Sequence, residues 1–271
     1  ELVEQKPVRR SPAHMSNDFC ELVCSNSLKS DDVFGNACGL LKEEMRRLGS
    51  LTMEAAAATR VPAGGALAVD RERFSAYVTE KLRTHPKIHI ACREADSLPE
   101  SGIVATGPLT DGALYEAIAA RFGGGLHFYD ATAPVVTAES VDMAAAFTAD
   151  RYGRGTGDYV NCPMNKEEYE TFVRELLSAE KVTLRDFEKR EIFEGCMPVE
   201  VMAARGKDSL RFGTFKPVGL ENEDGKRPYA VLQLRRENEE GTLLGLVGCQ
   251  TNLKFGEQKR VFSLIPALRN A

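Results

Sequence analysis

The sequence predicts an α/β fold with two parts: a first part in which helices alternate with short strands, and a β-rich second part. One observation is a segment with apolar residues at helical spacing, 37–59, among short apolar segments typical of strands. Another is a pair of Val-, Leu- and Thr-rich segments, 228–235 and 241–251, which a polar, glycine-containing turn joins into a hairpin. The character of the sequence changes after Gly125, so we place the boundary near residue 121.

A strand end and two helices open the predicted fold. Residues 1–4 have the composition of the end of a strand. From 37 to 59 apolar residues recur at steps of three and four, which predicts one amphipathic helix. The apolar positions are Leu40, Leu41, Met45, Leu48, Leu51 and Ala55. Asp70 is a suitable N-cap for a second helix that ends near Leu82, because its carboxylate can accept bonds from first-turn amides.

Short strands and helices are predicted for the rest of the chain. Strands are expected at 87–92, 101–107 and 126–130, where short apolar segments lie between polar or glycine-rich turns. Helices are expected at 111–121 and, in the second part, at 166–181, which is rich in charged residues. Together these elements predict a first part built on a parallel sheet and a β-rich second part.

Length, charge and cysteine content limit the class of protein. The chain has 271 residues, 43% of them hydrophobic, which is enough for one large domain or two ordinary ones. The formal net charge is -5, so a nucleic acid would have to be bound by a local basic patch. Seven cysteines without a CxxC pair fit neither a disulfide framework nor a zinc site, and indicate a reducing compartment. We expect no metal and assign the four histidines no catalytic role.

The sequence also bears on localisation and on the chain ends. It has no run of about 18 apolar residues and no signal peptide, so we expect a soluble, cytoplasmic protein without a membrane partner. The first residue is Glu1 rather than Met, and the last segment, 262–268, is apolar and lacks a polar tail. We therefore expect both termini to be cuts in a longer protein.

Two cysteines lie in segments suited to a reactive thiol. Cys196 stands between Gly195 and Pro198, which mark an exposed turn, and nearby basic residues would stabilise a thiolate. Cys24 is followed by the polar residues 25–27 and is also expected in a loop. For either cysteine the alternative is a small buried side chain without a chemical role.

A carboxylate and a small-residue segment indicate contact with a nucleotide. Glu4 closes an apolar strand, where dinucleotide-binding folds place the acid that accepts a bond from an adenosine ribose hydroxyl. Ala105, Thr106 and Gly107 end a predicted strand and project little beyond the main chain, so another group can approach the backbone closely. The alternative for Glu4 is a solvated acid at a strand end.

Basic and aromatic residues gather in the second part of the sequence. Cations with aromatic residues among them can bind phosphates and stack on bases. The residues are Arg205, Lys207, Arg211, Lys216, Lys254, Lys259 and Arg260, with Phe212, Phe215 and Phe255. A solvated basic face is the alternative, and the acidic residues Glu221, Glu223 and Asp224 favour it.

A series of short motifs runs in order along nearly the whole chain. They lie at 7–14, 21–28, 60–71, 105–110, 161–164, 193–198, 210–213, 216–220 and 256–262. Two of them contain the candidate cysteines, as ELVCSNSL at 21–28 and FEGCMP at 193–198. Together the motifs resemble the folate- and FAD-dependent tRNA (uracil-5-) methyltransferase family.

The resemblance implies a fold and a division into domains. An incomplete FAD-binding Rossmann-like domain is expected at 1–121, and a β-rich α+β insertion domain for the substrate at 122–257. A return toward the FAD-binding domain is expected at 258–271. Complete members of the family have glycine-rich FAD segments near both ends, which this sequence lacks. We therefore expect the chain to bind FAD weakly.

The resemblance also implies roles for the candidate residues. Cys196 matches the nucleophile and Cys24 the second catalytic thiol, Glu4 matches the acid on the adenosine ribose, and 105–107 match the strand end against FAD. The implied reaction methylates uracil C5 in the T loop of tRNA. In it, 5,10-methylenetetrahydrofolate is the one-carbon donor, reduced FAD supplies the hydride, and NADPH or NADH is the reductant.

Three other hypotheses remain open at this point. The related flavoprotein family that modifies the wobble uridine of tRNA shares the FAD domain but does not need the motif at 193–198. A module that only binds tRNA would shift tRNA in a gel without carrying flavin. A truncated product without independent function is the third hypothesis.

Overall fold

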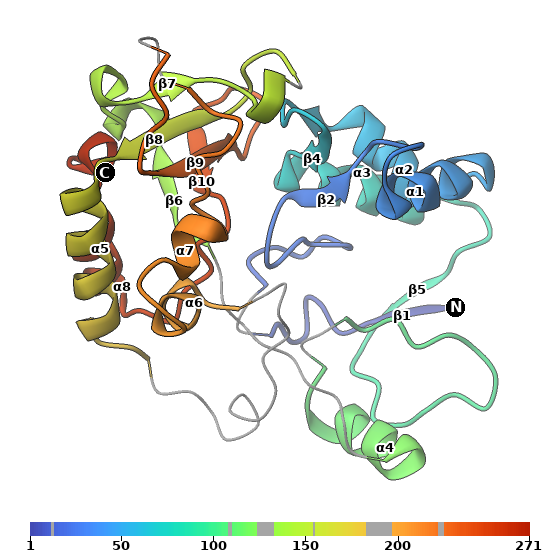
Figure 1. Ribbon diagram of the computed structural model, residues 1–271. Helices are drawn as coiled ribbons and strands as arrows, with labels where there is room; N and C mark the ends of the chain where they lie inside the picture. The colour runs from blue at the N-terminus through green and yellow to red at the C-terminus, as the bar shows by residue number, and fades with distance from the viewer. Residues whose placement is uncertain (12–13, 108–109, 124–132, 154, 183–196, 222–224) are drawn as a thin grey trace.

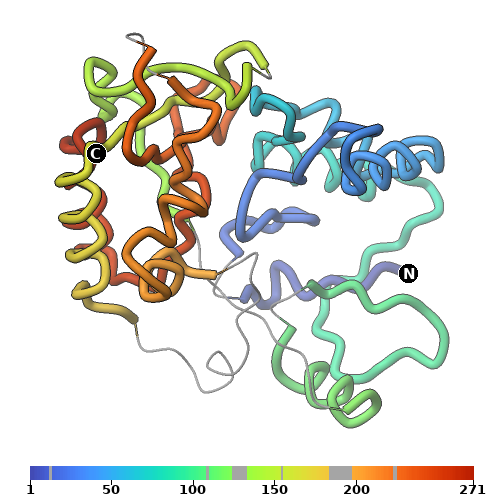
Figure 2. The backbone as a smooth tube through the Cα atoms, in the orientation of Figure 1, coloured from blue at the N-terminus to red at the C-terminus, as the bar shows by residue number. Residues whose placement is uncertain are grey.

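The computed structural model describes residues 1–271 except 12–13, 108–109, 124–132, 154, 183–196 and 222–224. A first part contains the described residues before 124, and a second part is built around a five-stranded sheet (Figure 1). Figure 2 shows that the C-terminal residues, in red, run within the second part, and that the N-terminus lies on the far side of the first part.

Two small sheets and a group of helices make up the first part. β1 (Leu2–Glu4) pairs in parallel with β5 (Ile90–Cys92). An antiparallel sheet has the order β2-β4-β3. Its strands are β2 (Ser27–Ser30), β3 (Arg60–Val61) and β4 (Ala66–Val69). The helices are α1 (Ala37–Arg47), α2 (Leu51–Ala58), α3 (Arg71–Thr84) and α4 (Gly112–Phe122).

The prediction of one continuous helix at 37–59 is wrong, because the chain breaks between α1 and α2. Gly49 has a φ of 71° and donates from its N–H to the carbonyl of Arg46, while Ser50 N–H bonds to the carbonyl of Met45. These two bonds form a Schellman motif, in which a glycine in the left-handed region ends a helix. Helical spacing continues through 37–59, but Gly49 permits a turn that separates two shorter helices.

Other predictions for the first part are confirmed in most places. Asp70 caps α3, since its Oδ1 accepts a bond of 3.0 Å from Arg73 N–H. The helix at 111–121 is confirmed as α4, and the strand at 87–92 is confirmed in its last residues, as β5. The strand at 101–107 is wrong: the segment has no strand pairing and Ile103 is 92% exposed. The predicted strand at 126–130 lies outside the described residues.

The second part is an antiparallel sheet with the order β6-β10-β9-β8-β7. The strands are β6 (Val135–Thr137), β7 (Phe147–Thr148), β8 (Val160–Met164), β9 (Ala230–Arg236) and β10 (Leu243–Leu246). β9 and β10 pair directly, so the predicted hairpin is confirmed. Most side chains of β9 are buried, as expected for a strand at the centre of its sheet.

Helices cover the sheet and complete the larger core. They are α5 (Lys166–Ser178), α6 (Val199–Ala204), α7 (Ser209–Phe212) and α8 (Phe255–Phe262), with the short 3-10 helices η1 (Ala138–Ser140), η2 (Met143–Ala145), η3 (Arg151–Gly153) and η6 (Pro266–Leu268). The predicted helix at 166–181 is confirmed as α5, and the Asn165 and Glu168 side chains form a capping box at its start.

Aromatic rings fill the centre of this larger core. The ring of Phe172 lies 5.6 Å from that of Phe215 and 5.7 Å from that of Phe262, measured between centroids. Residues of α8 and η6 belong to the same core, and Asp142 N–H bonds to the carbonyl of Ala267 at 2.9 Å. The segment 258–271 therefore packs with the second part, whereas its expected return toward the first domain, like the other domain limits, stays a prediction.

Candidate functional site

Cys24 lies in the loop that leads into β2, as the sequence predicts. Its side chain is half-buried. The loop is fixed to the first part through Asn26, which is fully buried and accepts a main-chain bond of 3.0 Å from Val69 N–H at the end of β4. The thiol therefore stands on a segment whose backbone is held in place.

The second part reaches this loop through Arg235 of β9. The guanidinium of Arg235 donates from Nε to Asn26 Oδ1 at 2.9 Å and from Nη2 to Ser25 Oγ at 3.1 Å. Asn26 returns a bond from Nδ2 to the carbonyl of Arg236 at 2.9 Å. Arg235 is only 8% exposed, so these charge-assisted bonds are shielded from water and hold the two parts together.

Gln250 makes the contact with the thiol itself. Its Nε2 donates to Cys24 Sγ at 3.9 Å, and its main-chain carbonyl accepts a bond of 2.7 Å from Val199 N–H. Val199 begins α6 and follows Cys196 by three residues in the sequence. Cys196 itself lies outside the described residues. One glutamine therefore contacts both the Cys24 side chain and the start of the helix that comes after Cys196.

A buried acid fixes the segment that carries Gln250. Glu200 of α6 is 2% exposed, and its carboxylate accepts bonds from Thr251 Oγ1 at 2.8 Å and from Asn252 N–H at 2.9 Å. Each carboxylate oxygen of Glu200 therefore accepts a bond from one of the two residues that follow Gln250. Neither Glu200 nor Gln250 belongs to a motif that the sequence singled out.

Two other cysteines are structural. Cys162 in β8 and Cys249 are fully buried in the larger core. Burial among apolar side chains raises the pKa of Cys162 to about 12 and raises that of Cys249 well above the ordinary thiol value. Their thiols stay protonated at neutral pH, so each is a poorer candidate for chemistry than the half-buried Cys24.

Glu4 ends β1, beside Cys92 of the parallel strand β5. Its Oε1 accepts a bond of 3.0 Å from Lys6 N–H. Parallel strands bring their carboxyl ends to one sheet edge, where α/β proteins bind nucleotides. The Arg9 side chain, just beyond that edge, pairs with Glu94 after β5 at 3.1 Å and with Asp111 at the start of α4. The structure thus gathers the segments after β1 and after β5 and the start of α4.

Ala105, Thr106 and Gly107 lie on an exposed segment rather than at a strand end. Thr106 Oγ1 lies 2.6 Å from Thr110 Oγ1, which also bonds to the carbonyl of Gly107, and Gly107 has a φ of 80°. Because 105–107 belong to no strand, the strand end that the sequence predicts for these residues is wrong. Their role at the cofactor stays a prediction.

The basic and aromatic residues predicted as a nucleic-acid surface have different surroundings. Phe215 is fully buried in the core, whereas Phe212 and Phe255 are 73% and 84% exposed. The Arg211 guanidinium lies 4.1 Å from the ring centroid of Tyr229 and 5.3 Å from that of Phe212. This stack presents one cation and two rings on the same side of the second part.

Two of the other predicted cations are neutralised by acids. Lys254 Nζ lies 2.6 Å from the Glu180 carboxylate, and Arg260 lies 2.8 Å from both Glu175 and Glu257. Such exposed pairs lower the positive potential that a phosphate would meet. The basic surface is therefore more limited than the sequence predicts.

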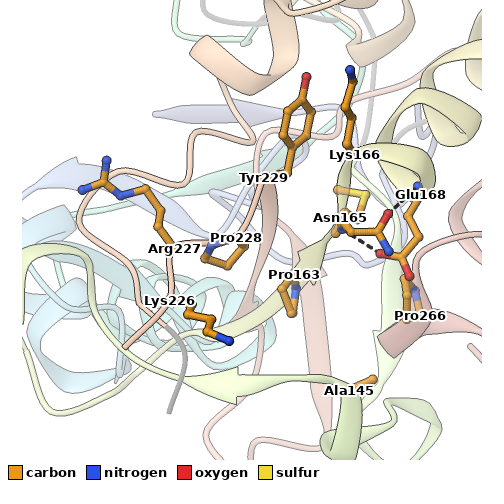
Figure 3. Close-up of a pocket in the computed structure, with 11 residues that line it drawn as sticks. Ala145, Pro163, Asn165, Lys166, Glu168, Lys226, Arg227, Pro228, Tyr229 and Pro266 are labelled. Carbon is orange, nitrogen blue, oxygen red and sulfur yellow. Dashed lines mark hydrogen bonds between the residues drawn. The ribbon is translucent and has the colours of Figure 1, made fainter. Parts of the chain in front are cut away.

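A hollow of about 460 Å³ lies beside the start of α5. Lys166, Lys226 and Arg227 line it together with the ring of Tyr229, and Figure 3 shows these side chains around it. Asn165 and Glu168 bond to one another at its edge, as the dashed lines in Figure 3 show. The hollow combines cations with an aromatic ring, which suits a phosphate and a base.

Within the described residues, no group of three or more His, Cys, Asp or Glu side chains is arranged to hold a metal. Among those same residues, no helix has the length and apolar character needed to span a membrane.

Comparisons with known proteins match the whole chain. A family model described as glucose inhibited division protein A matches residues 2–271. Relatives named methylenetetrahydrofolate–tRNA-(uracil-5-)-methyltransferase TrmFO, from Acetivibrio thermocellus and Geobacter sulfurreducens, are 59% and 58% identical over 274 residues. These alignments cover 100% of this chain and 63% of each relative. The chain thus spans less than two thirds of the length of these curated relatives.

A solved structure is similar in fold. The structure of Aquifex aeolicus GidA in its form II crystal has a TM-score of 0.56 to this chain at 12% sequence identity. The match covers 92% of this chain and 47% of that one. This likeness concerns the fold alone, and with the helices and sheets described above it confirms the predicted α/β class.

Proposed function

Because this chain belongs to the glucose inhibited division protein A family, we propose that it forms part of a folate-dependent tRNA (uracil-5-) methyltransferase, the activity in its relatives' names. The reaction methylates uracil C5 in the T loop of tRNA with 5,10-methylenetetrahydrofolate as donor. Identity of 59% over the whole chain supports this hypothesis over a wobble-uridine enzyme and over a module that only binds tRNA. A cytoplasmic location fits a tRNA substrate.

The observation that carries the proposal is the contact of Gln250 with both Cys24 and Val199. A thiol from the loop before β2 is thereby joined to the start of α6, which comes three residues after the second candidate thiol, Cys196. The two cysteines are 172 positions apart in the sequence. A reaction that uses two thiols requires such a junction between distant segments.

The chemistry requires a nucleophile and a proton acceptor from this chain. We assign the nucleophile to Cys196, whose thiolate adds to uracil C6 and makes C5 a carbon nucleophile. C5 then bonds to the methylene carbon of the folate, a base removes the C5 proton, and the folate nitrogen leaves with the electron pair of its bond to that carbon, which leaves an exocyclic methylene on C5. We assign the removal of this proton to the Cys24 thiolate. A hydride completes the methyl group, and the bond between Cys196 sulfur and C6 breaks as the C5–C6 double bond returns.

The first part contains residues that fit a flavin nucleotide. Glu4 stands at the carboxyl end of a parallel strand, where its carboxylate can accept a ribose hydroxyl. At Gly107, an added Cβ would meet no described atom within 4 Å, so a group can approach this backbone. Reduced FAD, when bound, supplies the hydride. We propose NADPH or NADH as the reductant of the flavin.

The domain division follows from the same assignment. We propose that 1–121 bind the cofactor, that 122–257 bind substrate, and that 258–271 lead back toward the cofactor domain. The hollow at the start of α5, with Lys166 and Arg227, is the part of the second region best suited to a tRNA phosphate.

The test uses tRNA with 5-fluorouracil at the target site and an enzyme of the relatives' full length. Fluorine at C5 cannot leave as a proton, so a covalent adduct is trapped after methylene transfer. Cys196→Ala should retain flavin and form no adduct, whereas Cys24→Ala should form the adduct and fail to turn over. An adduct with Cys196→Ala and none with Cys24→Ala would show that the two roles are reversed. Full turnover by both variants would rule out the two-thiol mechanism.

A further inference from the structure

Gln250 occupies a position between the two parts that the proposed mechanism leaves without a role. It follows the fully buried Cys249, and its side chain is half-buried. Its amide contacts Cys24 Sγ at 3.9 Å, and its carbonyl accepts the bond from Val199 N–H at 2.7 Å. The residue is therefore anchored by its main chain on one side and directed at a thiol on the other.

The neighbours of Gln250 restrict where its side chain can lie. Cys249 packs in the larger core, and Thr251 and Asn252 are bonded to the buried Glu200 carboxylate. Because the backbone of this segment is already fixed, the bond to sulfur costs only the rotamer entropy of the Gln250 side chain. The main chain thus places the amide within reach of the sulfur.

A hydrogen bond donated to sulfur favours the thiolate over the thiol, because the donor stabilises negative charge. Arg235 is bonded to Ser25 and Asn26 in the Cys24 loop, and its positive charge favours the thiolate too. Tyr159, close to Arg235, is a protonated phenol at neutral pH, since burial raises its pKa. Cys24 thus has a donor at its sulfur and a cation bonded to the next two residues of its loop, in contrast to the apolar surroundings of Cys162.

We propose that Gln250 is a positioning residue for Cys24: its amide orients the thiol and favours the thiolate, and its carbonyl holds the start of α6 at the same point. The proposal rests on the proposed function, in which Cys24 accepts the C5 proton. It assigns Gln250 no contact with substrate or cofactor. Its consequence is that ionisation of Cys24 depends on a residue from the other part of the molecule.

The test is the pH dependence of iodoacetamide alkylation at Cys24, followed by mass spectrometry in this chain. Gln250→Leu removes the donor at similar volume. It should raise the pH midpoint of Cys24 alkylation by about one unit, which makes the reaction below that midpoint roughly tenfold slower. Gln250→Glu places a carboxylate there and should raise it further. The plateau rate at high pH reports access to the thiol, so ionisation and access are measured separately.

Two controls make the result specific. Gln258→Leu removes a glutamine whose Nε2 bonds to the carbonyl of Leu253, and it should leave the Cys24 midpoint unchanged. The buried Cys162 should stay unreactive in every variant that is folded. An unchanged midpoint in both Gln250→Leu and Gln250→Glu, with Cys162 protected, overturns the proposal.

An activity measurement separates this proposal from the proposed function. In the enzyme of full length, Gln250→Leu should lower kcat while the 5-fluorouracil adduct still forms. Normal turnover by Cys24→Ala would refute the role of Cys24 as proton acceptor. It would not refute the effect of Gln250 on the pH midpoint of Cys24 alkylation. An unchanged midpoint beside an inactive Cys24→Ala would refute only the role of Gln250.

Discussion

Removal of the Asn26 side chain should weaken the junction between the two parts more than its size suggests. Asn26→Ala deletes the acceptor of Arg235 Nε and the donor to the Arg236 carbonyl, both at 2.9 Å. Asn26 is fully buried and Arg235 is 8% exposed, so water does not replace these bonds without rearrangement. A hydrogen bond to a charged group contributes about 1.5–3 kcal/mol, and the bond to the partly buried Arg236 carbonyl contributes about 1 kcal/mol. We expect the free energy of unfolding to fall by about 3 kcal/mol.

Urea unfolding followed by far-UV circular dichroism measures this loss. The matched control is Asn238→Ala, because Asn238 also makes two bonds, to Thr242 and to Leu243 N–H, but at a solvent-exposed turn. The control should cost less than about 1 kcal/mol, since water takes over those bonds. The reasoning is refuted if Asn26→Ala costs no more than Asn238→Ala.

Three further predictions concern thiols, a surface acid and the core. Native Cys162, with a pKa of about 12, should resist iodoacetamide at pH 8 while the exposed Cys38 reacts; equal labelling would contradict the burial argument. Burial alone would raise the pKa of Asp31, but the Arg46 and Arg60 guanidinium groups together outweigh it and lower the pKa. Asp31→Asn should therefore cost about 1 kcal/mol in urea unfolding at pH 7, and the difference should shrink as pH falls below about 4 and vanish once pH is below the lowered pKa of the native carboxyl. Phe172→Ala should cost about 3–5 kcal/mol in the same assay, and a loss below 1 kcal/mol would show that the core repacks around the cavity.

Elements with strong local signals could be predicted from the sequence. The Asp70 cap of α3, the charged helix α5 and the β9–β10 hairpin were predicted, because each of these depends on residues close in the chain. The helix at 37–59 was predicted too long, since apolar spacing continues across Gly49 although a left-handed residue there turns the backbone.

The segment at 101–107 was predicted as a strand that the structure does not contain. Its apolar residues predict a strand, but Ile103 is almost fully exposed and the segment has no strand pairing. A strand is stabilised by cross-strand contacts, which local composition does not specify.

The candidate site was predictable only in part, for a related reason. The loop position of Cys24 and the strand-end position of Glu4 depend on local sequence, and the structure agrees with both. Arg235 and Gln250 could not be predicted, because their partners are more than 200 residues away and no motif marks them. Long-range polar contacts of this kind follow from how the two parts dock rather than from any pattern within either one.

The contact between Gln250 and Cys24 also has a consequence for synthesis of the protein. The two residues are 226 positions apart. At about 5–20 residues per second, a ribosome needs roughly 10 to 45 s to translate that interval. During this time the Cys24 loop has been synthesised but Gln250 has not. The Cys24 thiol of the nascent chain is therefore accessible to oxidants and other thiols. A reducing compartment, which the cysteine content predicts, would protect Cys24 during this period.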